Sequence, residues 1–539
     1  MTAMILSNEP SAIVIRTDDK WHTLARAGAD RWEAAGLAIT MKRRENTIAL
    51  ELEAPTAAVR TIKLRWNEAP AGNLLLLGDH WERGYGDLEW RGIVPERVMP
   101  WYFLAHDGLR TAGYGVKTGA NSLCYWQLDT DGVTFTADVT SGNSGVCLGA
   151  RTLSVADIIF DPGTLGETPF AAARRFCAMM CDKPLMPKQP VYGGNNWYYA
   201  YGESSHREIL EDSRFISSLS SNTLNRPYMV IDDGWQSAKD NGGSCNGGPW
   251  IGNSKFTDME RLAGEMKEIG VKPGLWFRPL LTTENVPAEW IRYKEASTGS
   301  SVLDPSIPDV LAHIRESVER MVGYGFDMLK HDFTTYDMLG QWGFTMKSKP
   351  HALPYAFHDR SKTTAEITLA LYRTIAEASG QADIIGCNTF SHLSAGLFEI
   401  QRTGDDTSGR WWERTRYMGV NTMAFRMAQH GTFYSHDADC LGLTKDVPWS
   451  YNREWLRLLA GSGTPLFVSA DPAIVTKEQE LELRAAFELA AQPLPVGEPL
   501  DWLRTTCPSC WVLNGEETSF QWNEVSAELL DEKDNGWWV

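Results

Sequence analysis

The chain has 539 residues, of which 43% are hydrophobic and 22% are charged, and its formal net charge is -18 at pH 7. This length exceeds what one ordinary core holds, so we expect two to four domains, and the composition excludes large-scale disorder. The acidic balance argues against nucleic acid or an anionic membrane surface as a partner.

Cysteine usage and the N-terminal residues predict the compartment. Nine cysteines without a repeating spacing do not predict a disulfide framework. The first ten residues lack a basic region followed by an apolar one, so no secretory signal is expected. No apolar run approaches the roughly 18 residues of a membrane span. We therefore expect a cytoplasmic protein, an expectation that a removed leader would change.

Residues 1–185 are predicted to form an N-terminal β-sandwich domain. Short alternating runs such as 11–16 and 47–52 are separated by polar turns, and Asp131-Gly132 is typical of a hairpin turn. A loop broken by glycines, 78–87, carries Trp81 and Tyr85. This loop either leans over the site of a neighbouring domain or is a turn pinned by its aromatic side chains.

A short helix is expected over 171–180, and the prolines of 183–190 indicate a domain boundary. Beyond them, short apolar runs alternate with helical patterns. The strand candidates are 191–195, 228–232, 273–277, 327–331, 383–387, 398–402, 432–436 and 466–469. Eight successive β–α units predict an α/β fold with a central (β/α)8 TIM barrel over 186–490. A doubly wound open sheet is disfavoured because no Gly-rich phosphate turn follows the first strand.

The last segment, 491–539, is predicted to be a small C-terminal β-domain. Its short runs and turns carry Trp502, Trp511, Trp522, Trp537 and Trp538. Cys507-Pro508-Ser509-Cys510 is a single CxxC without a second pair, which does not indicate a zinc site.

Active sites of this barrel type lie at the C-terminal ends of the strands, and four of the eight predicted strands end in acidic clusters. These clusters are Asp232-Asp233-Gly234-Trp235, Lys330-His331-Asp332, Arg402-Thr403-Gly404-Asp405-Asp406 and His436-Asp437-Ala438-Asp439. The ends of the other strands supply Asn195 with Trp197, Trp276 with Arg278, and Cys387 with Asn388. Taken singly, each cluster has a plain structural interpretation, such as a turn or a surface ion pair.

The cluster at the fourth strand suggests a nucleophile. Residues two apart in a strand point the same way, so Lys330 and Asp332 are expected to project together. An ammonium next to a carboxylate lowers the carboxylate's pKa and keeps it ionised, as a carboxylate nucleophile requires.

Other chemistries lack their residues in this sequence. His436 with Asp437 and Asp439 comes nearest to a metal-ligand set, but its spacing is not convincing, and no nucleophile-elbow serine is present. Carboxylates interleaved with aromatic residues, in a chain with 22 Trp, are typical of a glycoside hydrolase that needs no cofactor. The expected partner is an oligosaccharide or glycoside substrate. Association into a homo-oligomer is left open.

Three of these motifs together resemble a known family. Asp232-Asp233-Gly234-Trp235, Leu329-Lys330-His331-Asp332 and Arg402-x-x-x-Asp406, in this order at strand ends, are similar to the melibiase-type α-galactosidases of glycoside hydrolase clan D. The resemblance implies a retaining α-galactosidase in which Asp332 is the nucleophile and Asp406 the acid/base.

The same resemblance implies the substrate-binding residues. They are Asp232 and Asp233 for the galactose 4- and 6-hydroxyls, Trp197 as an aromatic platform, Trp276, Lys330 and Arg402 around the ring, and Cys387 with Asn388 near the 2-hydroxyl. His331 stands where the family has Tyr, Phe or Trp, and the segment after Cys387 departs from the family pattern. The 2-substituent of the sugar is therefore open.

Two carboxylates with different tasks need different surroundings. We expect Lys330 to lower the pKa of Asp332 and Asp405 to raise that of Asp406, with the catalytic carboxyl groups about 5–5.5 Å apart. Asp405 is the alternative to Asp406 as acid/base. The alternatives for the whole chain are a transglycosylating relative similar to raffinose synthases, a carbohydrate-binding homologue without catalysis, and a metal-dependent hydrolase.

Overall fold

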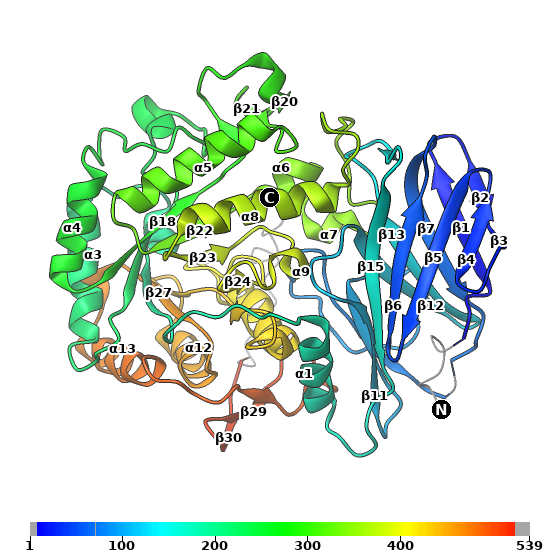
Figure 1. Ribbon diagram of the computed structural model, residues 1–539. Coiled ribbons are helices and arrows are strands. Elements are labelled where there is room, and N and C mark those ends of the chain that lie inside the picture. Colours follow the sequence, from blue (N-terminus) through cyan, green and yellow to red (C-terminus); the bar gives the residue numbers. More distant parts are fainter. Residues whose placement is uncertain (1–7, 71, 523–539) are drawn as a thin grey trace.

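The computed structural model describes residues 8–70 and 72–522. It has a mixed α/β fold in which two antiparallel sheets lie beside a curled parallel sheet that helices cover (Figure 1).

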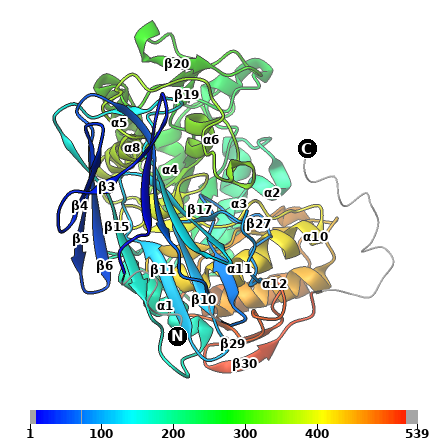
Figure 2. The ribbon, with the colours of Figure 1, turned by 90° about the vertical axis from the view of Figure 1, so that its right-hand side faces the viewer.

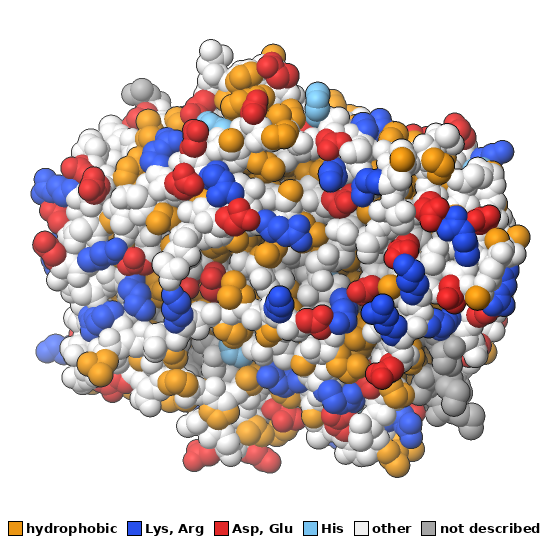
Figure 3. Space-filling model, in the orientation of Figure 1, with side chains coloured by type: hydrophobic (Ala, Val, Ile, Leu, Met, Phe, Trp, Pro, Cys, Tyr) orange, Lys and Arg blue, Asp and Glu red, His pale blue; other side chains and the backbone are white. Residues whose placement is uncertain are grey.

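Among the described residues, no helix is both long enough and apolar enough to cross a membrane. On the face that Figure 3 shows, acidic and basic side chains are interspersed, so the net negative charge does not form a single patch there.

The N-terminal part contains the two antiparallel sheets (Figures 1 and 2). The first has β2 (Trp21–Thr23), β1 (Ala12–Thr17), β7 (Ala58–Trp66), β13 (Gly132–Asp138), β12 (Leu123–Asp129) and β9 (Met99–Pro100) in that order, with β14 (Val146–Cys147) beside β7. The second has β3 (Ala25–Arg26), β4 (Arg31–Ala34), β5 (Leu37–Arg44), β6 (Thr47–Glu53), β15 (Thr152–Asp161), β11 (Thr111–Val116), β10 (Tyr102–His106) and β8 (Leu75–Gly78).

Sequence alternation explains these strands. In β1 the buried residues are Ile13, Ile15 and Thr17, and the residues between them are less buried, so one face of the strand packs against the core. The predicted hairpin joins β12 to β13, but its two-residue turn is Thr130-Asp131, one position before the predicted Asp131-Gly132, because Gly132 already pairs with Asp129.

The parallel sheet has nine strands, all joined by parallel pairings. Its order is β25 (Ser435–Asp437), β24 (Ile400–Arg402), β23 (Asp383–Gly386), β22 (Met328–His331), β18 (Lys272–Phe277), β17 (Tyr228–Ile231), β16 (Tyr192–Asn195), β27 (Leu466–Ala470) and β26 (Leu441–Leu443). Each of the eight predicted strands overlaps a strand of this sheet. The ninth, β26, was not predicted.

The two ends of this sheet are consecutive in the chain. β25 pairs only with β24, and β26 only with β27, yet just three residues, 438–440, separate them. Since a residue spans at most about 3.5 Å, this link holds the two ends close to one another. The sheet therefore curls until its first and last strands are neighbours.

Helices follow most of these strands. The longer ones are α3 (His206–Leu219), α4 (Met259–Ile269), α5 (Pro308–Gly323), α8 (Thr364–Ser379), α12 (Trp449–Gly461) and α13 (Lys477–Ala490), and α1 (Pro169–Met180) precedes the first strand of the sheet. The shorter ones are α2 (Trp197–Ala200), α6 (Thr334–Leu339), α7 (Gly343–Met346), α9 (Ser391–Ser394), and the continuous run of α10 (Trp412–Arg414), η4 (Thr415–Val420) and α11 (Asn421–Arg426).

Helix α4 shows how local sequence sets the bounds of a helix. The Asp258 side chain accepts a hydrogen bond from the Arg261 amide at the N-terminus, and Gly270 ends the helix with a φ of 99°. Both are preferred caps. Met259, Leu262 and Met266 are buried, at the spacing of one helix face.

Two small antiparallel sheets complete the fold. One consists of β19 (Leu281–Thr282), β21 (Ser301–Leu303) and β20 (Ile291–Lys294), and it lies between β18 and α5 in the chain. The other consists of β28 (Glu498–Pro499), β29 (Cys510–Leu513) and β30 (Glu516–Ser519). Trp537 and Trp538, which the sequence placed in the last segment, lie outside the described residues.

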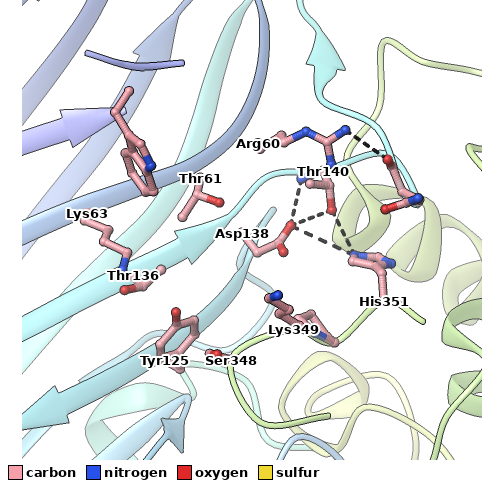
Figure 4. Close-up of a pocket in the computed structure, with 14 residues that line it drawn as sticks. Arg60, Thr61, Lys63, Tyr125, Thr136, Asp138, Thr140, Ser348, Lys349 and His351 are labelled. Carbon is pink, nitrogen blue, oxygen red and sulfur yellow. Dashed lines mark hydrogen bonds and ion pairs between the residues drawn. The ribbon is translucent and has the colours of Figure 1, made fainter. Parts of the chain in front are cut away.

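Buried polar contacts join the N-terminal sheets to the rest of the chain. Arg426 of α11 pairs with Asp79, which follows β8, at 2.6 Å, and both side chains are buried. At a second contact, the Thr140 hydroxyl lies 2.9 Å from Nε2 of His351. Beside that contact is a pocket of about 430 Å³ (Figure 4).

We expect the Arg426–Asp79 pair to contribute to stability. Arg426→Met leaves a buried carboxylate without its cation, which costs about 3–5 kcal/mol of unfolding free energy. Urea denaturation followed by circular dichroism measures this loss. The control is Arg207→Met, which removes an exposed arginine and is expected to change stability by less than about 0.5 kcal/mol. Equal effects of the two substitutions would contradict this role.

Candidate active site

Asp232, directly after β17, lies next to Lys330 of β22. The Lys330 Nζ is 2.7 Å from Oδ2 of Asp232, and both side chains are buried. Asn195 donates to the same oxygen at 2.8 Å, and Asn196 accepts from the Asp232 amide. Burial by itself lowers the pKa of Lys330, but Asp232 and, more weakly, Asp332 raise it above its ordinary value. The ammonium is therefore charged.

This arrangement corrects one prediction. Lys330 was expected to lie next to Asp332, two residues further along the chain, but its ion pair is with Asp232, which follows β17, two strands away in the sheet. β18 lies between β17 and β22 in the sheet, so the lysine side chain reaches past one strand to the carboxylate. His331, between them, is buried against Phe277 and Phe398, and burial lowers its pKa to about 3.

Asp332 is held by three N–H donors from three segments. Trp276 Nε1 of β18 donates to Oδ2 at 3.1 Å, while the amides of Phe333 and Asn388 donate to Oδ1 at 2.7 and 3.0 Å. Phe333 has a φ of 62°, a left-handed conformation that costs roughly 1–2 kcal/mol for a residue with a side chain. The turn at the end of β22 thus stores strain while it aims an amide at the carboxylate.

Asp406 lies against arginine side chains. Its Oδ1 is 3.1 Å from Nη2 of Arg402 and 3.4 Å from Nη1 of Arg83, and its side chain is 41% exposed. Burial by itself raises the pKa of Asp406, but Arg402 and Arg83 outweigh it and hold this pKa well below its usual range. In the unliganded protein Asp406 is therefore ionised.

A second prediction is thereby wrong. Asp405 was expected to raise the pKa of Asp406 by like-charge repulsion, yet the pKa of Asp406 is lowered. The reason is that arginines neutralise both acids: Asp405 pairs with Arg83 at 3.1 Å and with Arg414 at 2.9 Å. Sequence adjacency says nothing about such partners.

Arg402 connects the two sides of the cluster. It is buried, its Nη2 also lies 3.0 Å from Oδ2 of Asp439, and its Nη1 lies 3.8 Å from Sγ of Cys387. Burial, followed by the charge of Asp332, raises the pKa of the Cys387 thiol well above its ordinary value. Asp439, considered in the sequence as part of a metal set, is thus an arginine partner.

The structure therefore brings Asp332 and Asp406 into one network. The connection runs from Asp332 through the amide of Asn388 to the adjacent Cys387, then through Arg402 to Asp406. Neighbouring parallel strands, β22, β23 and β24, position these residues at one edge of the sheet.

The other predicted substrate-binding residues lie around this network. Asp233 pairs with Lys239 at 3.1 Å and accepts from Gln236. Trp197 follows β16 and is half-buried. The side chain of Asn388 faces away from Asp332, because it binds Thr335 and Glu82. Arg83, Glu82 and Arg414 were not assigned to the site from sequence. The Gly-broken loop 78–87 was the only signal for the first two.

Neither a metal cluster nor the pocket in Figure 4 belongs to this network. In the described part of the chain, no three His, Cys, Asp or Glu side chains converge as metal ligands do. The pocket lies on the outer face of the first antiparallel sheet, and none of its lining residues belongs to the carboxylate network (Figure 4).

A double-mutant cycle tests the partner of Lys330. Lys330→Met is expected to lower the unfolding free energy by about 3–5 kcal/mol, because it leaves Asp232 buried and unpaired. Adding Asp232→Asn should recover part of this loss, whereas adding Asp332→Asn should recover none. Urea denaturation of six proteins, namely the wild type, the three single variants and the two double variants, gives both coupling energies. A larger coupling to Asp332 would contradict the observed pairing.

The chain was compared with known protein families, curated proteins and solved structures. No model of a known protein family matches the chain. Among curated proteins, the α-galactosidase AgaA of Geobacillus stearothermophilus is 26% identical over 140 residues, which cover 24% of this chain and only 18% of AgaA.

Solved structures match over far more of the chain. The α-galactosidase TtGalA of Thermus thermophilus, in complex with p-nitrophenyl α-D-galactopyranoside, has a TM-score of 0.60 at 16% identity, covering 94% of this chain and 99% of its own. A GH36 α-galactosidase, an AgaA variant from Geobacillus stearothermophilus in complex with raffinose, has a TM-score of 0.61 at 14% identity, covering 93% and 79%. The resemblance predicted from the motifs is confirmed: this chain has the fold of GH36 α-galactosidases.

Proposed function

We propose that the chain is a retaining glycoside hydrolase that cleaves terminal α-galactosides or closely related α-glycosides. The observation that carries this proposal is the network joining Asp332 and Asp406 at the ends of β22 and β24. Two carboxyl groups on either side of one sugar are the machinery of glycoside hydrolysis. The relatives bound to an aryl α-galactoside and to raffinose support the choice of substrate.

We infer that the curled sheet is a closed (β/α)8 barrel. The supporting observation is the division of its seventh strand: β25 pairs on one side and β26 on the other, around Asp439 with a φ of 81°. Counted as one interrupted strand, they bring the number of strands to eight. The ends of parallel barrel strands form the usual place for an active site.

In the proposed reaction, Asp332 attacks the anomeric carbon and Asp406 donates its proton to the leaving oxygen. The bond from Asp332 to the sugar forms as the glycosidic bond breaks. Asp406 then takes a proton from water, which attacks the same carbon and frees Asp332. Trp276 and the two amides that bind Asp332 fix its orientation. The separation of the two carboxyl groups is expected to be about 5–5.5 Å.

The glycone is proposed to lie over β16 and β17. Asp232 and Asp233 would accept hydrogen bonds from its hydroxyls, and each is already paired with a lysine. Lys330 and Arg402 would contact the ring from the neighbouring strands, and Trp197 offers an aromatic face. A panel of aryl α-glycosides that differ at carbons 2, 4 and 5 identifies the sugar, and product analysis at high acceptor concentration separates hydrolysis from transfer.

Asp332→Ala is expected to abolish turnover of an aryl α-galactoside, because the covalent intermediate no longer forms. Added azide should restore part of the activity and yield a β-glycosyl azide, detected by NMR. Asp327→Ala is the matched control, since Asp327 directly precedes the same strand at its opposite end and pairs with Lys267 there. Full activity of Asp332→Ala would overturn the assignment.

The low pKa of Asp406 makes a second prediction. Asp406 is ionised in the empty site, but it must carry a proton to act as the acid. Sugar binding removes water from the site and thereby favours the neutral carboxyl. We expect a galactose-type inhibitor to bind with uptake of a proton by the wild-type protein and without it in Asp406→Asn. Titration calorimetry in buffers of different ionisation enthalpy measures this. The same uptake in both proteins would exclude Asp406 as the group that is protonated.

A further inference from the structure

The loop 78–87 from the N-terminal sheets reaches the proposed catalytic residues. It leaves β8 at Gly78, and its backbone pairs with the segment after β24: the Gly84 amide donates to the Thr403 carbonyl at 2.7 Å, and the Asp405 amide donates to the Gly84 carbonyl at 2.8 Å. The Arg426–Asp79 ion pair holds the start of the loop. Of the two readings left open by the sequence, the loop leans over the site.

Arg83 of this loop contacts both acids that follow β24. Its guanidinium binds Asp405 at 3.1 Å and Asp406 at 3.4 Å, and its side chain is only 7% exposed. The rings of Tyr85 and Trp342 lie 5.9 and 5.7 Å from it, within the range of cation–π attraction. The guanidinium is therefore held in place and cannot swing into solvent.

Glu82, the preceding residue, lies behind the other carboxylate. Its Oε2 accepts from the Asn388 side chain at 2.5 Å and from the Thr335 hydroxyl, and its Oε1 accepts from the Gly343 amide at 2.8 Å and from the Tyr85 hydroxyl. The backbone amide of the same residue, Asn388, donates to Asp332 at 3.0 Å. Glu82 is fully buried, and among the described residues no lysine, arginine or histidine forms an ion pair with it.

A buried carboxylate without a cation is costly unless donors surround it. Those around Glu82 come from the segment after β23, from α6, from α7 and from its own loop. Such a group specifies how these segments sit relative to one another. Its neighbour Arg83 does the same for the acids after β24, and it also places a positive charge on one of them.

We propose that Glu82 and Arg83 are positioning residues for the reaction. Arg83 places its charge next to the acid/base Asp406. Glu82 binds the side chain of Asn388 and thereby fixes the backbone amide of Asn388, which orients the nucleophile Asp332. One dipeptide of the N-terminal sheets thus organises both carboxylates. The inference rests on the proposed function.

Arg83→Met is the first test, with Arg151→Met as its matched control. Arg151 also forms an ion pair between the N-terminal sheets and the rest of the chain, with Glu366 at 2.7 Å, but it does not contact the network. The basic limb of the kcat/KM profile reports the acid of the free enzyme. Loss of the Arg83 charge lets Asp406 keep its proton to higher pH, so this limb should move up by about one pH unit.

The control and a retained charge make the test specific. Arg151→Met should leave the limb where it is in the wild type, and Arg83→Lys should return it most of the way. If Arg83 only fastens the loop, Arg83→Met lowers activity by the same factor at every pH and the limb does not move. That result would overturn the role of Arg83.

Carboxyl NMR with ¹³C-labelled aspartate separates this inference from the proposed function. The Asp406 signal, assigned by its loss in Asp406→Asn, is titrated in wild type and in Arg83→Met. A higher Asp406 pKa in Arg83→Met supports the inference even if no glycoside is cleaved. An unchanged pKa overturns it, while an inactive wild type overturns only the proposed function.

Glu82→Gln tests the other half of the dipeptide. Glutamine has the size of glutamate, but its NH2 group faces donors where glutamate has a second oxygen that accepts from them. One pair of donors is then left without an acceptor, so the segment that contains Asn388 should shift. We expect kcat to fall about tenfold, the worth of one hydrogen bond to a charged group, with KM changed less than twofold. A loss confined to KM or to stability would contradict positioning of Asp332.

Discussion

Carboxylates grouped at the edge of a protein core repel one another and lose hydration, so they can be kept there only by partners. This constraint explains most of the polar structure around the candidate site. Asp232 has Lys330, Asp233 has Lys239, and Asp405 has Arg83 with Arg414. Asp332 differs, because N–H donors rather than a salt bridge hold it. A carboxylate oriented in this way keeps its charge available for a ligand.

The same constraint makes the N-terminal sheets part of the site. Arg402 and Arg414 each pair with one of the two acids after β24, and Arg83, from the loop after β8, adds a further positive charge to both. The loop is anchored by a buried ion pair and by backbone pairing with the segment after β24. Removing the N-terminal sheets would therefore take away one of the two arginines that pair with each of Asp405 and Asp406.

Much of this architecture was predictable from local pattern. Short apolar runs indicated each strand of the parallel sheet except β26, and Lys-x-Asp, Asp-Asp and Arg-x-x-x-Asp marked the strand ends where the network lies. The charge relations were not predictable in this way. Lys330 and Asp332 are two positions apart at the end of β22, yet the lysine binds Asp232 after β17, two strands away in the sheet. Asp405 and Asp406 are adjacent in the chain, yet the arginines that pair with them outweigh the repulsion between the two carboxylates.

By itself the sequence determined the fold class, the order of the strands and which residues stand at their carboxyl ends, because periodicity and turn residues act over a few positions. Only the tertiary structure decided which cation meets which carboxylate. An ion pair depends on distances of 3–4 Å between side chains that are far apart in the chain, and Arg83 lies more than three hundred positions before Asp406. No local pattern encodes such a contact; the packing of the loop after β8 against the segment after β24 creates it.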